Sequence, residues 1–279
     1  MRSARVCFES MMKIFRPSTR LLVLTLLTSS LVAGGCASRQ GRPPAAGTQA
    51  DKFLFERGTE ALNNKKWARA REYFRQLVDN YPQSPYRPDA KLGLGDTYLG
   101  EGTSESLVLA INEFREFLTF FPTHRRADYA QYKLALAHFR QMAGPERDQT
   151  QTKDAVKEFE VFIERYPNSG LMPEVRAKLR EARDRLSESD YRVGLFYFRV
   201  RWYPGAIDRF KSVLKSDPEY SNRDAVYYYL AESLVKVNRQ AEALPYYEQL
   251  VKEFERSEYL QRALQRIGEL KGADNVKRG

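Results

Sequence analysis

Apolar residues recur along most of this chain at intervals of three and four, the spacing that places them on one face of an α-helix. The first two segments with this spacing, 51–64 and 67–81, carry the stripes Leu54, Gly58, Ala61, Leu62 and Ala70, Phe74, Leu77, Val78. Further segments follow at 90–98, 106–120, 127–141, 153–166, 173–199 and 258–270. Loops separate the segments, so the pattern predicts an all-α chain built from antiparallel helix pairs.

One motif recurs five times within these segments: an alanine, an aromatic residue four positions later and, in four copies, a proline eight positions further on. The copies are Ala70–Phe74–Pro82, Ala110–Phe114–Pro122, Ala155–Phe159–Pro167, Ala206–Phe210–Pro218 and Ala243–Tyr247, where Glu255 replaces the proline. Small residues let two helices approach closely, the ring fills the gap between hairpins, and the proline ends the second helix. This motif resembles the tetratricopeptide repeat (TPR), so we expect a TPR superhelical solenoid of five helix hairpins.

The segment between the third and fourth copies is the longest without an interruption. Residues 173–199 contain no helix breaker except Gly194, and their apolar residues keep the helical spacing. We therefore expect a long helix that opens the fourth repeat. It divides the folded part into repeats 1–3 at 51–170, and the long helix, repeats 4–5 and an amphipathic capping helix at 171–271. Residues 272–279 are expected to form a frayed tail.

The N-terminal region reads as a targeting segment. Basic residues precede a short apolar run at 21–27, and the sequence Leu-Val-Ala-Gly-Gly-Cys follows at 31–36. This order is typical of a secretory signal, and the run is too short for a membrane span, which takes about 20 apolar residues. Because Cys36 stands where a bacterial lipobox has its acylated cysteine, we expect a lipoprotein signal peptide at 1–35 and a lipidated Cys36 with a flexible tether at 36–50. The alternative is an ordinary cleaved signal with an incidental cysteine.

Two further expectations concern the same region. The residues after Cys36 contain no aspartate at the position that retains lipoproteins in the inner membrane, so delivery to the outer membrane is expected by resemblance. Glu9 and Cys7 are unusual in a signal peptide, and we therefore leave open whether translation begins at Met1 or at Met11 or Met12.

Charge and cysteine content narrow the function classes. The formal net charge is +10, which favours either contact with anionic lipid or acidic partners, or simply a solvated face of mixed charges. No nucleic-acid reader motif is present, and secretion removes the opportunity for nucleic-acid binding. The chain has 2 cysteines, and signal cleavage removes Cys7, so the mature chain contains no intramolecular disulfide.

The sequence contains no catalytic or metal-binding constellation. The 2 histidines, His124 and His138, lie on different segments without clustered cysteines or carboxylates. Nucleophile elbows, phosphate loops and zinc motifs are absent. We therefore expect no enzyme, no metal, and no cofactor other than the diacylglycerol and N-acyl (palmitate) chains covalently held by Cys36.

Three segments resemble the BamD family, the TPR lipoproteins of the β-barrel assembly (Bam) machinery. They are 70–86 with its Tyr81-Pro82-Gln83-Ser84 end, 162–169 with Tyr166-Pro167-Asn168-Ser169, and Tyr191–Phe198 ahead of Tyr203–Phe210. The resemblance covers residues 51–270. It implies a lipid-anchored scaffold on the periplasmic face of the outer membrane that takes part in folding and inserting β-barrel proteins. The implied partners are a BamA-type insertase, other Bam lipoproteins and unfolded outer-membrane proteins.

Two other readings of the repeats and anchor stay open. A pilotin-like TPR lipoprotein that escorts a secretin shares both features but usually lacks the long helix. A TPR adaptor for cell-wall or division enzymes often carries a coiled coil before the repeats, and residues 37–50 contain none.

The first helices of repeats 1–3 supply the candidate binding groove, because these helices line the inner wall of TPR arrays. The residues placed there are Phe55, Leu62, Leu92, Tyr129, Tyr132, Leu136, Phe139 and Arg140. Aromatic rings beside an arginine suit an extended peptide that ends in an aromatic residue and a carboxylate. By resemblance, this ligand is the C-terminal signal of unfolded outer-membrane proteins. The alternative is that single rings pack against the neighbouring hairpin.

Aromatic residues and arginines also crowd repeats 4–5. The predicted partner contacts are Tyr191, Phe198, Arg199, Arg201, Trp202 and Tyr228. Tryptophan, tyrosine and arginine are favoured at interface hot spots. The resemblance implies that these residues dock the soluble domains of the BamA-type insertase.

Overall fold

The structure, a computed structural model, describes residues 49–278, and the side chains of residues 49–272. The expected signal peptide, the lipidated Cys36 and the start codon lie outside the described residues. The helices are α3 (Ala50–Asn63), α4 (Trp67–Asn80), α5 (Arg87–Glu101), α6 (Ser104–Phe120), α7 (Ala127–Phe139), α8 (Thr150–Arg165), α9 (Met172–Arg199), α10 (Tyr203–Ser216), α11 (Arg223–Lys236), α12 (Gln240–Glu253) and α13 (Leu260–Arg278). The predicted all-α fold is confirmed for this part of the chain.

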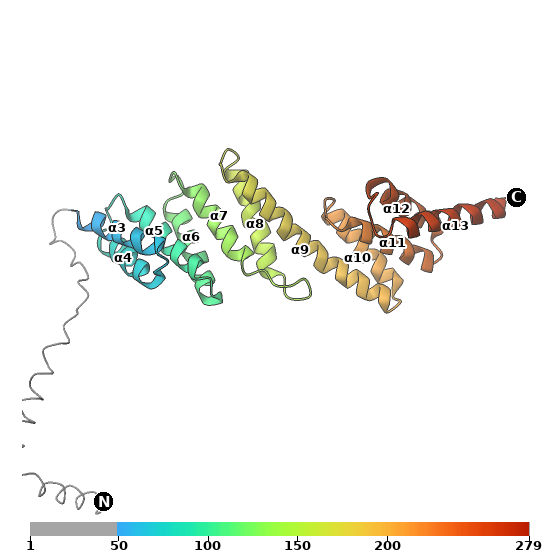
Figure 1. The fold of residues 1–279 in the computed structure, drawn as a ribbon, viewed down its shortest axis with the longest axis horizontal. Coiled ribbons are helices and arrows are strands. Elements are labelled where there is room, and N and C mark those ends of the chain that lie inside the picture. Colours follow the sequence, from blue (N-terminus) through green and yellow to red (C-terminus); the bar gives the residue numbers. More distant parts are fainter. Residues whose placement is uncertain (1–48, 279) are drawn as a thin grey trace, which may run out of the picture. The chain divides into compact units, whose positions relative to one another are not determined.

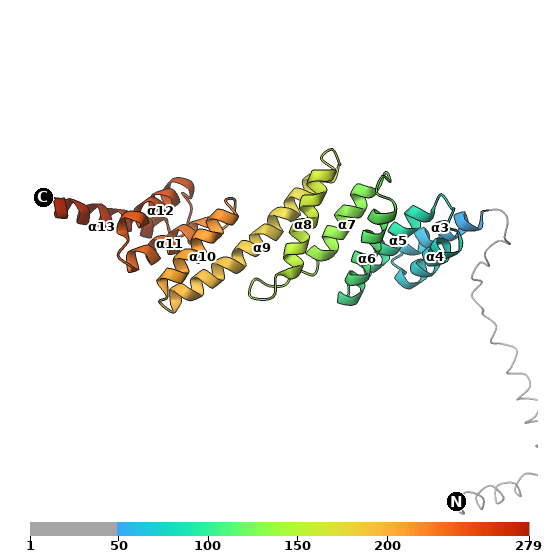
Figure 2. The same cartoon turned by 180° about the vertical axis from the view of Figure 1, so that it is seen from behind.

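The helices pair into hairpins that follow one another in chain order (Figures 1 and 2). Each helix from α3 to α12 packs against the next, and α13 packs against α12. The five hairpins are α3–α4, α5–α6, α7–α8, α9–α10 and α11–α12, as the repeated motif predicts. A stack of this kind buries its core between neighbouring units rather than in one central globule.

The repeated alanines and aromatic residues form the contacts inside and between hairpins. All five motif alanines are 0% exposed, and the rings of Phe114, Phe159, Phe210 and Tyr247 are likewise 0% exposed. Phe74 lies between two helices, since a Cβ on Gly58 of α3 or Gly93 of α5 would stand 2.5 Å from its ring. Only glycine allows the backbone of both helices to approach the ring this closely.

A serine-to-aspartate hydrogen bond closes four of the five hairpins. The serine follows the second helix, and the aspartate belongs to the first helix of the same hairpin. The pairs are Ser84–Asp51 (2.6 Å), Ser169–Asp128 (2.6 Å), Ser221–Asp184 (2.5 Å) and Ser257–Asp224 (2.5 Å). In the second hairpin His124 replaces the serine, and Arg126 instead donates to Asp89 over 3.0 Å. A serine in the turn after the second helix therefore ties that turn to the first helix of the hairpin, and in the first and third hairpins this serine belongs to a Tyr-Pro-x-Ser sequence.

The long helix α9 belongs to two stacks. It has 28 residues, and it packs against α7 and α8 on one side and against α10 and α11 on the other. Val175 and Leu179 join the core of the second and third hairpins, whereas Tyr191 joins the core of the fourth and fifth. The prediction of one long helix opening the fourth repeat is confirmed.

Two details differ from the sequence expectations. Helix α5 begins at Arg87 rather than at residue 90, because Pro88 occupies a first-turn position, where its missing N–H costs nothing. Helix α13 continues to Arg278, through a segment expected to fray. Among the described residues, no helix combines the length and apolar character that crossing a membrane requires.

Candidate functional site

A row of aromatic rings paired with charged side chains runs along the first helices α5 and α7. The hydroxyl of Tyr129 donates to both carboxylate oxygens of Asp96, at 2.9 and 3.0 Å. The guanidinium of Arg126 lies 4.5 Å and the amine of Lys133 lies 5.0 Å from the Tyr129 ring centroid. Two cations therefore stack on one ring whose hydroxyl is held by a carboxylate.

The row continues onto the first turns of α9. Tyr132 donates its hydroxyl to Glu174, and Lys133 lies 5.8 Å from the Tyr132 ring. The amine of Lys178 lies 4.8 Å from the centroid of the Phe139 ring. We call the set Asp96, Arg126, Tyr129, Tyr132, Lys133, Phe139, Glu174 and Lys178 the aromatic–cation row.

Burial affects the pKa values of two members of this row, Asp96 and Tyr129. Burial raises the pKa of Asp96, although the charge of Lys133 and the hydrogen bond from Tyr129 oppose that shift. Burial also raises the pKa of Tyr129, so its hydroxyl stays protonated as a donor. The contact thus joins a protonated phenol to a carboxyl group whose pKa burial raises and nearby cations lower.

The predicted groove residues divide into lining and core. Tyr129 and Phe139 are half-buried and belong to the row, and Arg140 is exposed, with Nη1 donating to the carbonyl of Leu99 at 2.8 Å. Leu92 is 0% and Leu136 is 7% exposed, so both are core residues rather than lining residues. Tyr132 is also buried, and it belongs to the row because its hydroxyl donates to Glu174.

The first hairpin contributes differently. Phe55 stacks on Tyr86 with ring centroids 5.2 Å apart, and Leu62 is half-buried against the core of that hairpin. Sequence reasoning missed the charged members of the row, which are Asp96, Arg126, Lys133, Glu174 and Lys178. Lys133 follows Tyr129 by four positions on α7, a helical spacing that the sequence offered as a signal. Asp96 on α5 and Lys178 on α9 meet rings of another helix, so the sequence offered no local signal for them.

The turn between α9 and α10 exposes an apolar tip flanked by cations. Phe196 is 59%, Val200 54% and Trp202 54% exposed. The Trp202 ring lies edge-on against Tyr197 at 4.5 Å, and Gly205 leaves room for it, since a Cβ there would stand 2.5 Å away. With the exposed Arg199 and Arg201, these residues form what we call the α9–α10 tip. Sequence reasoning found Trp202 and the arginines but missed Phe196 and Val200.

The other predicted partner residues form an aromatic cluster inside hairpins four and five. Tyr191 is 6% exposed and packs 5.9 Å from Phe210. Phe198 lies edge-on to Tyr229 at 5.1 Å, and Tyr228 stacks on Tyr259 at 4.8 Å. Tyr191 is therefore a core residue, whereas Phe198 and Tyr228 are half-buried. Phe198 lies next to the exposed tip, and Tyr228 lies next to Tyr259, just before α13.

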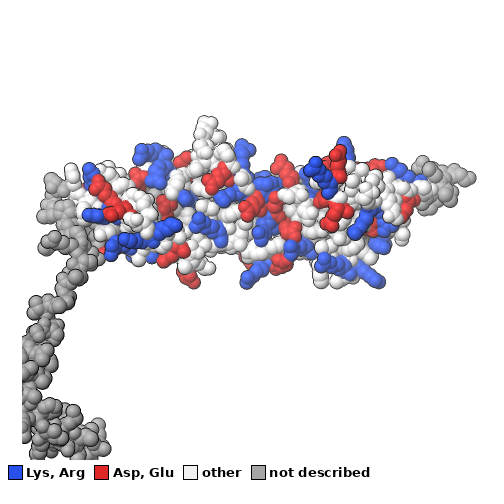
Figure 3. All heavy atoms as spheres, in the orientation of Figure 1, with Lys and Arg blue, Asp and Glu red and all other residues white. Residues whose placement is uncertain are grey.

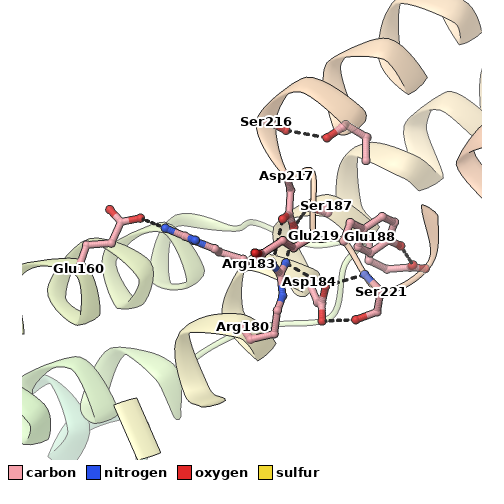
Figure 4. Close-up of polar contacts among 12 residues, drawn as sticks. Glu160, Arg180, Arg183, Asp184, Ser187, Glu188, Ser216, Asp217, Glu219 and Ser221 are labelled. Atoms are coloured by element: carbon pink, nitrogen blue, oxygen red, sulfur yellow. Dashed lines mark hydrogen bonds and ion pairs between the residues drawn. The ribbon is translucent and has the colours of Figure 1, made fainter. Parts of the chain in front are cut away.

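A polar network fastens the end of α10 to the middle of α9 (Figure 4). Arg180 points at Asp217 and donates to its Oδ1 from Nη1 at 2.9 Å, and Ser187 donates to Asp217 Oδ2 at 2.7 Å. Burial raises the pKa of Asp217, but the hydrogen bonds from Arg180 and Ser187 outweigh it and the pKa lies below its usual value. Arg183 points the opposite way and donates to Glu160 of α8 at 2.8 Å (Figure 4).

Charges of both signs are interspersed over the surface seen in Figure 3. The distribution on that face supports the interpretation of a solvated surface of mixed charges rather than a continuous basic patch. Among the side chains of residues 49–272, no three His, Cys, Asp or Glu residues are grouped as ligands of a metal ion. His138 is 5% exposed, and its Nδ1 lies 2.8 Å from Gln151 Oε1.

Comparison with known proteins gives matches over most of the chain. The family model YfiO, described as an outer membrane lipoprotein, matches residues 48–233, and a tetratricopeptide repeat model matches residues 225–257. The chain is 26% identical over 235 residues to outer membrane protein assembly factor BamD of Caulobacter vibrioides, covering 84% of this chain and 75% of the relative. It is also 26% identical to the proteins of the same name from Rickettsia prowazekii, over 81% of this chain and 88% of the relative, and Vibrio cholerae, over 70% and 82%.

Proposed function

We propose that the two stacks of hairpins bind different partners, from the premise that this chain belongs to the YfiO family of outer membrane lipoproteins. The chain is an outer membrane protein assembly factor of the Bam complex, like the relatives named above. Those names favour this role over the secretin-escort and cell-wall alternatives. The aromatic–cation row receives unfolded substrate, and the α9–α10 tip holds the membrane-embedded insertase.

Attachment to the membrane would come from the N-terminal region. Cleavage before Cys36 and acylation of that cysteine would anchor the protein in the inner leaflet of the outer membrane, on its periplasmic face. Two or more acyl chains give stable anchoring, whereas a single chain binds only reversibly. Residues 37–49 then serve as the tether between the anchor and α3.

The observation that carries substrate binding is the pairing of rings with cations in the row. Tyr129 and Phe139 each have an amine or guanidinium within about 5 Å of the ring centroid, at 4.5 Å for Arg126 and 4.8 Å for Lys178. A ring beside a cation can hold the aromatic side chain of a peptide and its terminal carboxylate together. The row would therefore bind an extended segment without chemically changing it, and the protein would act as a scaffold rather than an enzyme.

The α9–α10 tip suits a protein partner because it combines apolar anchors with arginines. Phe196, Val200 and Trp202 are more exposed than the other large apolar residues of this hairpin, and exposed apolar patches mark interaction sites. Arginines beside them favour a partner surface with carboxylates around an apolar centre. A soluble periplasmic domain of a BamA-type insertase is the partner that we propose.

Affinity purification from detergent-solubilised outer membranes tests the role as a whole. We expect recovery of a β-barrel protein with soluble periplasmic domains, and a photocrosslinker at Phe139 should join the chain to unfolded barrel substrates. A crosslinker at the exposed Glu72 of α4 serves as the matched control. Recovery of a secretin or of cell-wall enzymes without the barrel protein would contradict the proposal.

A further inference from the structure

A small pocket lies between the turn that follows α6 and the turn that follows α8. Its volume is about 270 Å³, and its lining includes His124, Arg125, Asp128, Arg165 and Asn168. None of these residues belongs to the aromatic–cation row or to the α9–α10 tip. We call this hollow the turn pocket.

The turn after α6 departs from the pattern of the other hairpins at the turn pocket. The other four hairpins close with a serine that donates to an aspartate of the first helix, whereas His124 stands in place of that serine here. Arg126 closes the second hairpin instead, through its bond to Asp89. His124 and the neighbouring Arg125 are therefore not needed for the closure and can serve the pocket.

The imidazole of His124 is oriented as a hydrogen-bond donor. The backbone N–H of Arg126 donates to its Nδ1 at 3.3 Å, so the neutral ring carries its proton on Nε2. The ring lies edge-on to Phe117 with the centroids 5.5 Å apart, which fixes its plane. Within the described part of the chain, the Nε2–H of His124 has no acceptor.

Two arginines bring cationic groups to the pocket without a close carboxylate. The side chain of Arg125 is 81% exposed and reaches Asp89 only at 4.0 Å, and Asp89 is already paired with Arg126 at 3.0 Å. Arg165 is exposed at the end of α8, and among the side chains of residues 49–272 no carboxylate lies within ion-pair distance of it. The exposed amide of Asn168 adds a neutral donor.

Asp128 supplies the carboxylate of the lining, and both of its oxygens are occupied. Oδ2 accepts a hydrogen bond from Ser169 at 2.6 Å, and Oδ1 accepts one from the backbone N–H of Tyr129 at 2.7 Å. Asp128 is half-buried, whereas Arg125 and Arg165 are exposed. The groups that remain free to bind a ligand are therefore donors, and two of them are cationic.

We propose that the turn pocket binds a phosphate group, held by the Nε2–H of His124, the guanidinium groups of Arg125 and Arg165, and the amide of Asn168. A tetrahedral phosphate accepts donors from several directions, whereas a carboxylate accepts them near one plane, and arginine pairs with phosphate through two parallel hydrogen bonds. One turn of α-helix, about 10 Å wide and about 5.4 Å long, occupies about 420 Å³. The pocket is smaller than that, so it suits a compact group rather than a helix.

The position of the pocket makes a lipid headgroup one source of the phosphate. Helix α3 begins at the same edge of the stack, because Asp51 in its first turn bonds to the turn after α4 in the way that Asp128 bonds to the turn after α8. Residues 37–49 would connect this edge to an acylated Cys36, so the headgroup source rests on the anchoring proposed above. Phosphate binding itself does not, since a soluble phosphate is the other source.

NMR of the imidazole C–H signals tests phosphate binding on the detergent-solubilised mature protein, because the chain has 2 histidines. Inorganic phosphate, titrated at constant pH and ionic strength, should shift the signals of His124 and leave those of His138, which is 5% exposed. Arg125→Gln and Arg165→Gln should each weaken phosphate binding roughly tenfold. Arg69→Gln, at an exposed position of α4, is the matched control and should bind as the parent does.

Two results of this titration would overturn the inference. One is an equal shift of the His124 signals by acetate, which would mean that the pocket does not distinguish phosphate from any other anion. The other is parent affinity for phosphate in both Arg125→Gln and Arg165→Gln, with native helicity by circular dichroism.

Vesicles distinguish the two sources of the phosphate. The mature chain with Cys36→Ser, which cannot be acylated, is sedimented with galactolipid vesicles that contain one-fifth phosphatidylglycerol or one-fifth oleate. Greater sedimentation with phosphatidylglycerol, lost in Arg125→Gln/Arg165→Gln, identifies a lipid headgroup as the ligand. Equal sedimentation with both vesicles rules out the headgroup and leaves a soluble phosphate. Mass spectrometry of the purified wild-type protein reports the acylation of Cys36 separately.

Discussion

Gly58 and Phe74 touch so closely that a Cβ on the glycine would stand 2.5 Å from Cε1 of the ring. The ring is 1% exposed and meets Gly93 on its other edge, so it has no space into which it could move. The contact joins α3 to α4, and the Gly93 contact joins α4 to α5. One ring therefore fixes the spacing of three helices.

The variant Gly58→Ala should lower the free energy of unfolding by up to about 2 kcal/mol. Overpacking costs about 1–3 kcal/mol, and the better helix propensity of alanine offsets about 1 kcal/mol of it. Urea unfolding followed by circular dichroism measures the change. Gly268→Ala is the control, because a Cβ there meets nothing within 4 Å; it should be neutral or slightly stabilising, and equal losses in both variants would contradict the role of the ring.

The variant Arg180→Met should lose about 3 kcal/mol of stability at pH 7, since it leaves the buried Asp217 without its cation. Because the folded pKa of Asp217 lies below its usual value of about 3.9, its contribution is present above that pH and is lost as the pH falls through the folded pKa. The deficit of the variant should therefore shrink at pH 3 and below.

Urea titrations at pH 7 and pH 3 check this expectation. Arg183→Met is the matched control, since its pair with Glu160 is exposed on both sides, at 42% and 49%. Exposed pairs contribute about 0–1 kcal/mol, so this variant should differ little from the parent at either pH. A deficit for Arg180→Met that stays constant between the two pH values would rule out Asp217 as its cause.

Charge reversal at the α9–α10 tip should weaken the contact with the insertase. Arg199→Glu, Arg201→Glu and Phe196→Ala should each reduce affinity at least tenfold, about 1.4 kcal/mol, as expected at a hot spot. Phe120→Ala on α6 is the control, because that ring is 67% exposed outside the tip. Co-purification with the insertase, and binding to its immobilised soluble domains, measure the effect. If all three variants fold and still bind the insertase with the affinity of the parent, the tip is not the insertase-binding site.

Substrate binding in the row should depend on its cations. Lys178→Glu should weaken binding of a peptide that ends in an aromatic residue and a carboxylate by roughly tenfold, because a like charge replaces the cation beside Phe139. Fluorescence anisotropy of the labelled peptide provides the measurement. The control variant Lys157→Glu, at an exposed position of α8, should bind the peptide with the affinity of the parent. When the C-terminus of the peptide is amidated, the parent and Lys178→Glu should bind it with equal affinity.

Sequence periodicity predicted the helices because the information is local. The alanine, the ring and the proline of each copy lie within thirteen positions, and their roles follow from helix geometry alone. The long helix α9 was predictable for the same reason, since the stretch after Pro173 contains no helix breaker except Gly194. The hydrogen-bond partners of Ser84 and Ser169 were not predictable, because each serine bonds to an aspartate on the first helix of its hairpin, 33 and 41 positions earlier.

The candidate sites were less predictable because they join distant segments. Asp217 breaks the Tyr-Pro pattern, and only the fold shows that it meets Arg180 of α9. Leu92 carries the periodicity of a lining residue but is fully buried, since periodicity marks a face and does not say what covers it. Phe196 and Val200 show the converse case of apolar residues left uncovered at a turn.

The shared helix α9 sets where this chain can be divided. A fragment ending at residue 170 would strip Val175 and Leu179 from the third hairpin and uncover its core. A fragment beginning at residue 200 would leave α10 without the helix that carries Tyr191 and Gly194. A cut on either side of α9 therefore uncovers one of the two cores that this helix completes.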